Sequence, residues 1–152
     1  MAALIASLPE LNAVLGETKF LAGYGVEVQG CAPGECDLFV PFAAGLERPG
    51  GFVSGMTLMG AADVAMWLAI MTTQGTAETW VTTDMKTAFL RSGVRESIVC
   101  RARVLKLGRR IAYGTVETLG ASSGLLAHHV ISYSRKTHAE SVHPQSHGKP
   151  QY

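Results

Sequence analysis

The longest apolar stretch of the chain runs from residue 54 to residue 74 and carries one charged side chain, Asp63. It is too long for a strand and rich in Ala, Met and Leu, so the pattern predicts a helix. Ser54 suits the N-cap of this helix, Gly55 its first turn and Gly75 the position after its last turn. A helix that is apolar on all sides is either buried in protein or spans a membrane.

The length of this stretch also fits a membrane span of roughly 17 to 25 residues. Asp63, however, lies near the middle of the stretch, where a charge costs about 3 kcal/mol. No other part of the sequence has the composition of a membrane segment. We therefore predict a helix that protein surrounds on every side, and no membrane partner.

Alternation of apolar and polar residues marks strands on both sides of the predicted helix. Before it, residues 26–29 and 35–42 predict a hairpin around a turn at 32–34. The second run places four apolar side chains on one face: Cys36, Leu38, Val40 and Phe42. Four further runs follow the helix: residues 79–90, 97–107, 110–119 and 125–134. The breaks between them are short, which favours antiparallel neighbours, so we expect a four-stranded meander in an α+β domain.

A chain of 152 residues is long enough for one domain with its own core. Residues 1–19 are predicted to form a helical extension, with a short helix over residues 9–15 that starts at Pro9. Residues 20–136 form the main domain. Residues 137–152 are polar, contain proline and lack periodicity, so we expect an extended tail there.

Composition adds information on partners and location. Hydrophobic residues make up 47% of the chain and charged residues 16%, so we expect apolar surface to be covered by a second copy in a homo-oligomer. The net charge of +1 gives no reason to propose nucleic-acid binding. The three cysteines lack zinc-site spacing and no signal peptide is evident, so we predict reduced thiols, a cytoplasmic protein and no metal.

Asp63 is the strongest candidate for chemistry, because its helical neighbours three and four positions away cannot pair with its charge. Burying a carboxylate is costly unless it is hydrogen-bonded. Two interpretations stay open: a catalytic acid, or an Asp bonded to backbone or to a cross-strand hydroxyl for structural reasons. Gly55 offers a backbone N–H at the positive end of the helix dipole, which is either an oxyanion-hole donor or an ordinary helix start.

Other polar residues are weaker candidates. Thr82 lies on the strand after the helix, and Asp84 on the same predicted face is an alternative to it. Basic side chains at strand ends suit phosphate groups as well as they suit a solvated turn; they are Arg91, Lys106, Arg109 and Arg110. His128 and His129 lack the spacing of a metal site and are interpreted as structural.

Three segments together resemble the PaaI-type acyl-CoA thioesterases of the hotdog fold. Ser54-Gly55-Met56 is similar to the His-Gly-Gly turn that opens the central helix of that family, and Asp63 matches its acidic residue nine positions after the His. TTDMKTAFLR at 82–91 resembles the family's next strand, and residues 108–134 resemble its last two strands. The resemblance covers roughly residues 20–136 and implies a curved antiparallel sheet wrapped around a long central helix.

The resemblance also implies an activity, the hydrolysis of an acyl-CoA or a related acyl thioester. In that family the residue matching Asp63 activates water or attacks the thioester, the residue matching Thr82 helps to hold the water, and the N–H matching Gly55 polarises the carbonyl. No cofactor is implied beyond coenzyme A as part of the substrate. The family's sites lie between subunits, which implies a dimer or a dimer of dimers. The predicted substrate-binding residues are Ser54, Met56, Arg48, Arg91, Lys106, Arg109 and Arg110.

Two positions depart from the family pattern. Ser54 stands where the family has His, and Arg48 falls on or near its Asn, a second oxyanion donor worth about 3 kcal/mol. These departures motivate a non-catalytic dimer that binds acyl thioesters as the alternative function. An acyl-thioester dehydratase fits less well, because it needs a His near the central helix and the first His of this chain is His128.

Overall fold

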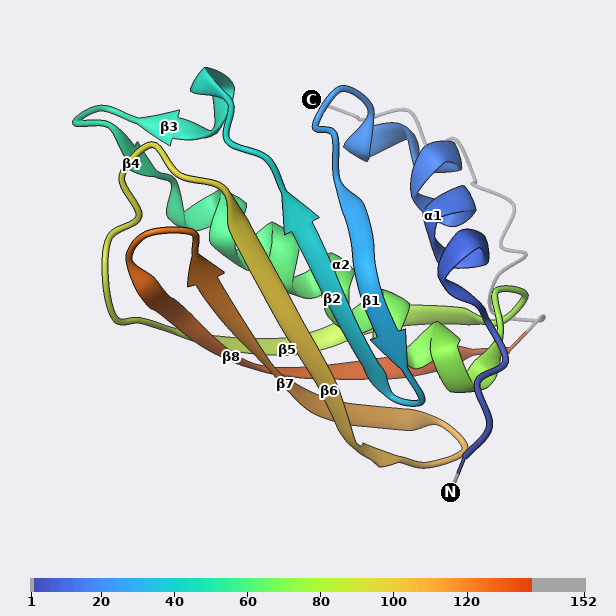
Figure 1. Cartoon of the computed structure of the whole chain (residues 1–152). Helices are drawn as coiled ribbons and strands as arrows, with labels where there is room; N and C mark the ends of the chain where they lie inside the picture. The colour runs from blue at the N-terminus through green and yellow to red at the C-terminus, as the bar shows by residue number, and fades with distance from the viewer. Residues whose placement is uncertain (1, 138–152) are drawn as a thin grey trace, which may run out of the picture.

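The computed structural model describes residues 2–137, so most of the predicted tail lies outside the described residues. Its main feature is a curved antiparallel sheet that wraps around a long helix, α2 (Gly55–Gln74) (Figure 1). The order of the strands is β1-β2-β6-β7-β8-β5. Their bounds are β1 (Glu27–Ala32), β2 (Glu35–Val40), β5 (Thr79–Phe89), β6 (Ile98–Leu107), β7 (Ile111–Gly120) and β8 (Gly124–Lys136). The predicted α+β hotdog fold is confirmed.

Local sequence signals fix both ends of α2. The Ser54 hydroxyl accepts a hydrogen bond from the Thr57 N–H at 3.1 Å, and Gly75 ends the helix with a φ of 80°. The helix packs closely on β7 because Gly114 has no side chain: a Cβ there would lie 2.6 Å from the methyl group of Met66 and would also meet a backbone carbonyl of β6. By length and composition α2 is apolar enough to cross a membrane, but more than half of the apolar stretch is buried inside the domain.

One side of α2 is left uncovered by the other described residues, 2–137, so for this part of a single copy the prediction of a helix buried on every side is wrong. Met56 is 86% exposed, Gly60 is exposed, and Asp63 and Trp67 are half-buried. These four residues recur every three or four positions and form one strip along the helix, called the open strip below. The sheet curves around the opposite side, where the core residues of α2 lie.

The first strand after the helix does not join the strand that follows it. β5 pairs with β8 at the far side of the sheet, while β6 lies between β2 and β7. The expected four-stranded meander is therefore wrong at its first connection and correct for β6, β7 and β8. Residues 90–97 carry the chain across, and the Gly93 carbonyl accepts a hydrogen bond from the Val53 N–H beside the start of α2. The buried Glu96 carboxylate anchors this crossover by accepting backbone N–H groups from Val94, Ser122 and Ser123.

A short hairpin that the sequence pattern did not predict leads into α2. It consists of β3 (Glu47–Arg48) and β4 (Phe52–Val53), and a 3-10 turn, η2 (Ala44–Leu46), precedes it. The first predicted hairpin is present with shifted ends, because β1 continues to Ala32 and β2 stops at Val40. Phe42 therefore lies beyond the strand, where its N–H donates to the Ser97 hydroxyl at 2.9 Å.

Helix α1 (Leu8–Glu17) lies beside β1 at one edge of the sheet (Figure 1). It is longer at both ends than predicted, and a capping box between Ser7 and Glu10 opens it. A second 3-10 turn, η1 (Lys19–Leu21), follows. The Asn12 amide group donates to the Val28 carbonyl at 3.1 Å and accepts from the Val28 N–H at 2.8 Å. The edge of β1 is thus occupied at this point by a side chain that imitates a neighbouring strand.

Candidate active site

Asp63 lies on the open strip of α2 and is held by side chains from two strands. Its Oδ1 atom accepts a hydrogen bond from the Thr82 hydroxyl of β5 at 2.7 Å and another from the Tyr133 hydroxyl of β8 at 2.6 Å. Tyr133 also lies within hydrogen-bond distance of the main-chain carbonyl of Asp63, at 2.7 Å. Within residues 2–137, Oδ2 makes no hydrogen bond. The carboxylate therefore has one occupied and one free oxygen.

The pairing of β5 with β8 brings the two hydroxyls together. Thr82 and Tyr133 are direct partners in the register, so both point to the face that α2 covers. A bulge at Thr83 then shifts the register, and Asp84 pairs with Ser132. Ser132 and Tyr133 are neighbours on β8, so their side chains point to opposite faces, and each partner on β5 shares the face of its own β8 residue. The bulge therefore puts Asp84 on the opposite face from Thr82. The expectation that Asp84 shares the face of Thr82 is therefore wrong.

Tyr133 was not among the predicted site residues. It is 3% exposed, and burial raises its pKa above the usual 10, with the negative charge of Asp63 and its hydrogen bond adding to the effect. The phenol therefore stays protonated and donates. The only sequence signal for Tyr133 was that it continues the alternating run of inward-facing residues that includes Ile131. That pattern indicates an inward position but does not reveal a partner such as Asp63.

The start of α2 forms a second group. Ser54 caps Thr57 only, and the N–H groups of Gly55 and Met56 find no acceptor among the described residues, as is usual for a first turn. A Cβ placed on Gly55 would lie 3.4 Å from the ring of Phe89 on β5. Because Gly55 does not have a positive φ, its backbone does not require glycine, and the missing side chain leaves space beside the Phe89 ring.

The two groups are far apart within one chain. Gly55 and Asp63 are eight residues apart on a continuous helix, which corresponds to about 12 Å of axial rise. An atom that binds to the Gly55 N–H is therefore out of reach of the Asp63 carboxylate of the same chain. The structure brings together Asp63 and Thr82, and it does not bring Gly55 to them.

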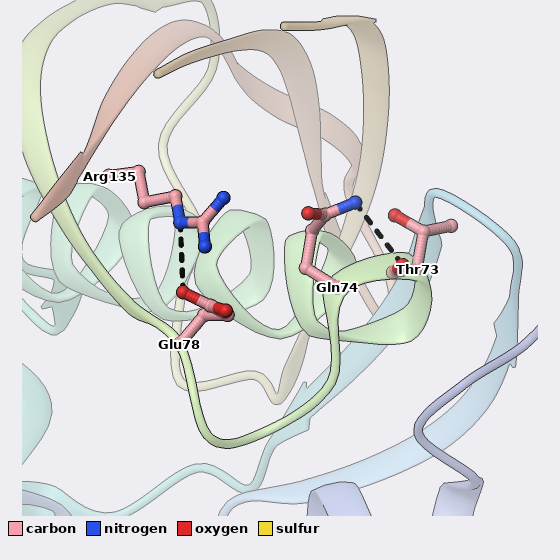
Figure 2. A network of polar contacts seen from close by, with 4 residues as sticks. All are labelled: Thr73, Gln74, Glu78 and Arg135. Atoms are coloured by element: carbon pink, nitrogen blue, oxygen red, sulfur yellow. Dashed lines mark hydrogen bonds and ion pairs between the residues drawn. The ribbon is translucent and has the colours of Figure 1, made fainter. Parts of the chain in front are cut away.

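The predicted basic residues do not gather at one place. Arg109 and Arg110 line a hollow of about 890 Å³ with Arg135 and Lys136, and Figure 2 shows the ion pair between Arg135 and Glu78, with an N–O distance of 2.8 Å. Lys106 is exposed on β6 and is not in the lining of this hollow.

The other two predicted arginines lie elsewhere. Arg91 follows the far end of β5 and donates to the Ser123 carbonyl at 2.6 Å, so most of the length of β5 separates it from the hollow, which begins at the other end of that strand. Arg48 is exposed on β3. The seven predicted substrate-binding residues are therefore spread over the molecule. Two lie at the start of α2 and two line the hollow; the other three, Arg48, Arg91 and Lys106, lie outside the hollow.

His129 is a satisfied structural histidine, as predicted. It is fully buried, and its ring nitrogens lie 2.8 Å from the hydroxyls of Thr87 on β5 and Thr118 on β7. Burial lowers its pKa to about 4, with His128 contributing. Residues 2–137 contain no group of three or more His, Cys, Asp or Glu side chains placed to hold a metal ion.

The curved sheet around one long helix defines a hotdog-fold protein, and the comparisons with known proteins give its family. The model of the Thioesterase superfamily matches residues 50–127, which is more than half of the chain. The chain belongs to that superfamily. The matched segment includes Gly55, Asp63 and Thr82 and ends before Tyr133.

Individual relatives agree with this assignment. A structure from a Silicibacter species, of a protein provisionally described as a thioesterase, is 27% identical with a TM-score of 0.81 over 90% of this chain and 96% of its own. A variant of the phenylacetic acid degradation protein PaaI from Thermus thermophilus is 27% identical with a TM-score of 0.69 over 78% of this chain and 100% of its own. A Thermoplasma acidophilum protein provisionally named an esterase is 25% identical over 82% of this chain and 93% of its own length. Family and neighbours together support thioesterase activity and hence a hydrolase.

Proposed function

We propose that this protein hydrolyses acyl-CoA or a closely related acyl thioester to the free acid and the thiol. The observation that carries the proposal is the geometry of Asp63: the only charged residue of α2 lies on the open strip, with Oδ1 held by Thr82 and Tyr133 and with Oδ2 free. A carboxylate fixed in this way is suited to act on water or directly on a carbonyl carbon.

The proposed reaction has two routes with the same products. In the first, Asp63 takes a proton from a water molecule, which adds to the thioester carbonyl; the C–S bond then breaks, and the thiolate receives the proton. In the second, Asp63 itself attacks the carbonyl and the C–S bond breaks to release the thiolate. Water then hydrolyses the resulting anhydride, which frees the acid and Asp63, and the proton that water gives up goes to the thiolate. In both routes the carbonyl oxygen becomes negative, and the Gly55 N–H at the start of α2 is the proposed donor to it.

The separation of about 12 Å along α2 requires that these two groups come from different chains if they act on one thioester. Among residues 2–137, no strand pairs with the outer side of β5, the last strand of the sheet. We propose a two-fold dimer in which β5 joins its counterpart. The site would then take Gly55, with Ser54 and Met56 beside it, from one copy and Asp63 and Thr82 from the other. The exposed residues of the open strip support this assembly, because a second copy would cover them.

For the coenzyme A portion we propose a phosphate site in the hollow described above, where Glu78 is paired with Arg135. Arg109 and Arg110 face it together with Lys136, and phosphate oxygens are strong acceptors for such side chains. Arg91, Lys106 and Arg48 are less suited to share this site, because they lie outside the hollow. No cofactor or metal is needed for the proposed chemistry. We also propose that the protein is cytoplasmic, and its three free cysteines support this location.

A non-catalytic dimer that binds acyl thioesters is the second candidate. It is favoured by Ser54 and Arg48 in place of the family His and Asn: Ser54 is used as a helix cap, and Arg48 is exposed on the β3–β4 hairpin. Such a protein would bind acyl-CoA without turnover.

A thiol-release assay over acyl-CoA substrates of increasing chain length, with aryl-acyl substrates included, tests the proposal. We expect turnover of at least one substrate class and a loss of roughly 10²- to 10⁴-fold in kcat for Asp63→Asn. Asp84→Asn is the matched control, since it makes the same chemical change on the opposite face of β5 and should retain full activity. Saturable binding of acyl-CoA without thiol release by the wild type would favour the non-catalytic alternative. Near-normal turnover by Asp63→Asn would remove Asp63 from the mechanism.

A further inference from the structure

We infer that Tyr133 is the positioning residue of the site: its hydroxyl locks the Asp63 side chain so that Oδ1 is occupied and Oδ2 is presented to the reacting atoms. The inference rests on the proposed function and adds a residue to it. Tyr133 lies outside the segment that the superfamily model matches, and its role follows from contacts in this chain.

The first step of the argument is that Tyr133 contacts Asp63 twice. Its hydroxyl lies 2.6 Å from Oδ1 and 2.7 Å from the main-chain carbonyl of the same residue. One hydroxyl between these two oxygens fixes the side chain relative to its own backbone. An aspartate in the middle of a helix would otherwise rotate among its staggered rotamers. The contact also ties the middle of α2 to β8.

The second step is that both hydroxyls use the same carboxylate oxygen. Thr82 donates to Oδ1 at 2.7 Å, and Tyr133 donates to it as well. Bonds of this kind to a charged acceptor are short and strong. These bonds hold Oδ1 and leave Oδ2 free. A base or a nucleophile needs such a fixed orientation of its free oxygen to act in a defined direction.

The third step is that the Tyr133 hydroxyl keeps the proton that it donates to Asp63. Burial and the charge of Asp63 raise the pKa of the phenol above its usual value, so the phenol is neutral at neutral pH. Thr82 is exposed and lies on the edge strand, whereas Tyr133 is buried and belongs to a strand paired on both sides. Of the two donors, Tyr133 is therefore the more rigidly placed, and we assign to it the larger share in orienting the carboxylate.

Tyr133→Phe tests the inference, because it removes one oxygen atom and retains the ring that fills this position. We expect kcat to fall roughly 10- to 100-fold, as for a lost hydrogen bond to a charged group, while KM stays within about twofold. Tyr113→Phe is the matched control: Tyr113 pairs with Ser132 and therefore faces away from α2, so its activity should equal that of the wild type.

A double-mutant cycle separates positioning from a general effect on the fold. In the Asp63→Asn background, Tyr133→Phe should cause no further loss of kcat, because the charged carboxylate that it orients is gone. Equal losses in both backgrounds, or an unchanged kcat in the single variant, would overturn the inference.

A readout without activity distinguishes failure of the inference from failure of the proposed function. In wild-type protein labelled with ¹³C at Asp, the Asp63 carboxyl signal should report one side-chain rotamer, and in Tyr133→Phe it should report an average over rotamers. A single unchanged rotamer in the variant contradicts the inference even if no thioester is hydrolysed. If Tyr133→Phe does not fold, 3-fluorotyrosine in the wild-type chain serves instead: Asp63→Asn should shift the Tyr133 signal, and no shift would contradict the contact.

Discussion

The two edge strands of the six-stranded sheet differ: other described parts of the chain cover β1, whereas none pairs with the outer side of β5. At β1 the Asn12 amide group fills both hydrogen-bonding positions of Val28, and α1 lies along the strand. At β5, eleven residues long, no described element pairs with the outer side. An unpaired edge invites another strand, and proteins commonly block it. The open edge carries Thr82 and lies beside the open strip of α2, and this difference supports the proposed dimer, in which a second copy would pair with β5.

The strongest way to test this contrast is to mix two inactive variants, Asp63→Ala and Gly55→Val. The valine would crowd Phe89, since even a Cβ at Gly55 lies 3.4 Å from its ring. If β5 joins two copies around shared sites, half of the dimers are mixed and each has one intact site of two. After subunit exchange we expect about a quarter of wild-type activity in the thiol-release assay.

A second mixture is the control. Asp63 and Thr82 contact each other within one chain, so mixing Asp63→Ala with Thr82→Val should restore nothing beyond the residual activity of the Thr82→Val chains. If the first mixture remains inactive after confirmed exchange, the shared-site dimer is wrong.

Acid should loosen the open edge, because His129 connects Thr87 of β5 to Thr118 of β7. Its pKa in the folded protein is about 4, below the ordinary value of about 6.5. Below pH 6.5 the unfolded chain binds a proton that the folded chain does not. The contribution of His129 to the free energy of unfolding is therefore complete above pH 6.5 and is lost at about 1 kcal/mol per pH unit between pH 6.5 and 4.

Urea unfolding of wild type and His129→Gln over this pH range measures that contribution. The variant is expected to be less stable at pH 7 and to lack this part of the pH dependence, while His128→Gln retains it. Parallel pH profiles for wild type and His129→Gln would contradict the lowered pKa, because they would mean that the imidazole binds its proton at the same pH in the folded and unfolded chains.

The smallest predicted effect concerns the closed edge. Asn12→Ala leaves the Val28 N–H and carbonyl without their partner, so we expect the free energy of unfolding to fall by about 2 kcal/mol. Asn12→Asp keeps an acceptor for the N–H but places a second carboxylate oxygen against the Val28 carbonyl, so we expect it to be no more stable than Asn12→Ala. Both are measured by urea unfolding at pH 7. Full stability in Asn12→Ala would mean that α1 closes this edge without the amide.

Features encoded locally were predictable from the sequence. The caps of α2 follow from Ser54 and Gly75, and the strand runs were found within a few residues of their observed ends. The family motif indicated Asp63, Gly55 and Thr82 as one functional set, and the eight-residue spacing already implied that one helix cannot bring Gly55 to Asp63.

Features that depend on long-range pairing were not predictable. A short break after residue 90 suggested that β5 joins β6, whereas the crossover fixed by Glu96 carries the chain to β6 at the other side of β7 and β8. The bulge at Thr83 reverses the face of Asp84, and alternation alone cannot reveal an inserted residue. Tyr133 became part of the site only through the β5–β8 register, which places its hydroxyl beside α2.

The Asn12 contact also bears on how many other copies could pair with the edges of this sheet. A sheet with one free edge can join one neighbour across a two-fold axis, and the assembly then has no free edge left. A sheet with two free edges could add copies at both ends and grow into a fibre without limit. In the proposed dimer, the Asn12 amide at Val28 would help to close the second edge, so that strand addition would end at a pair.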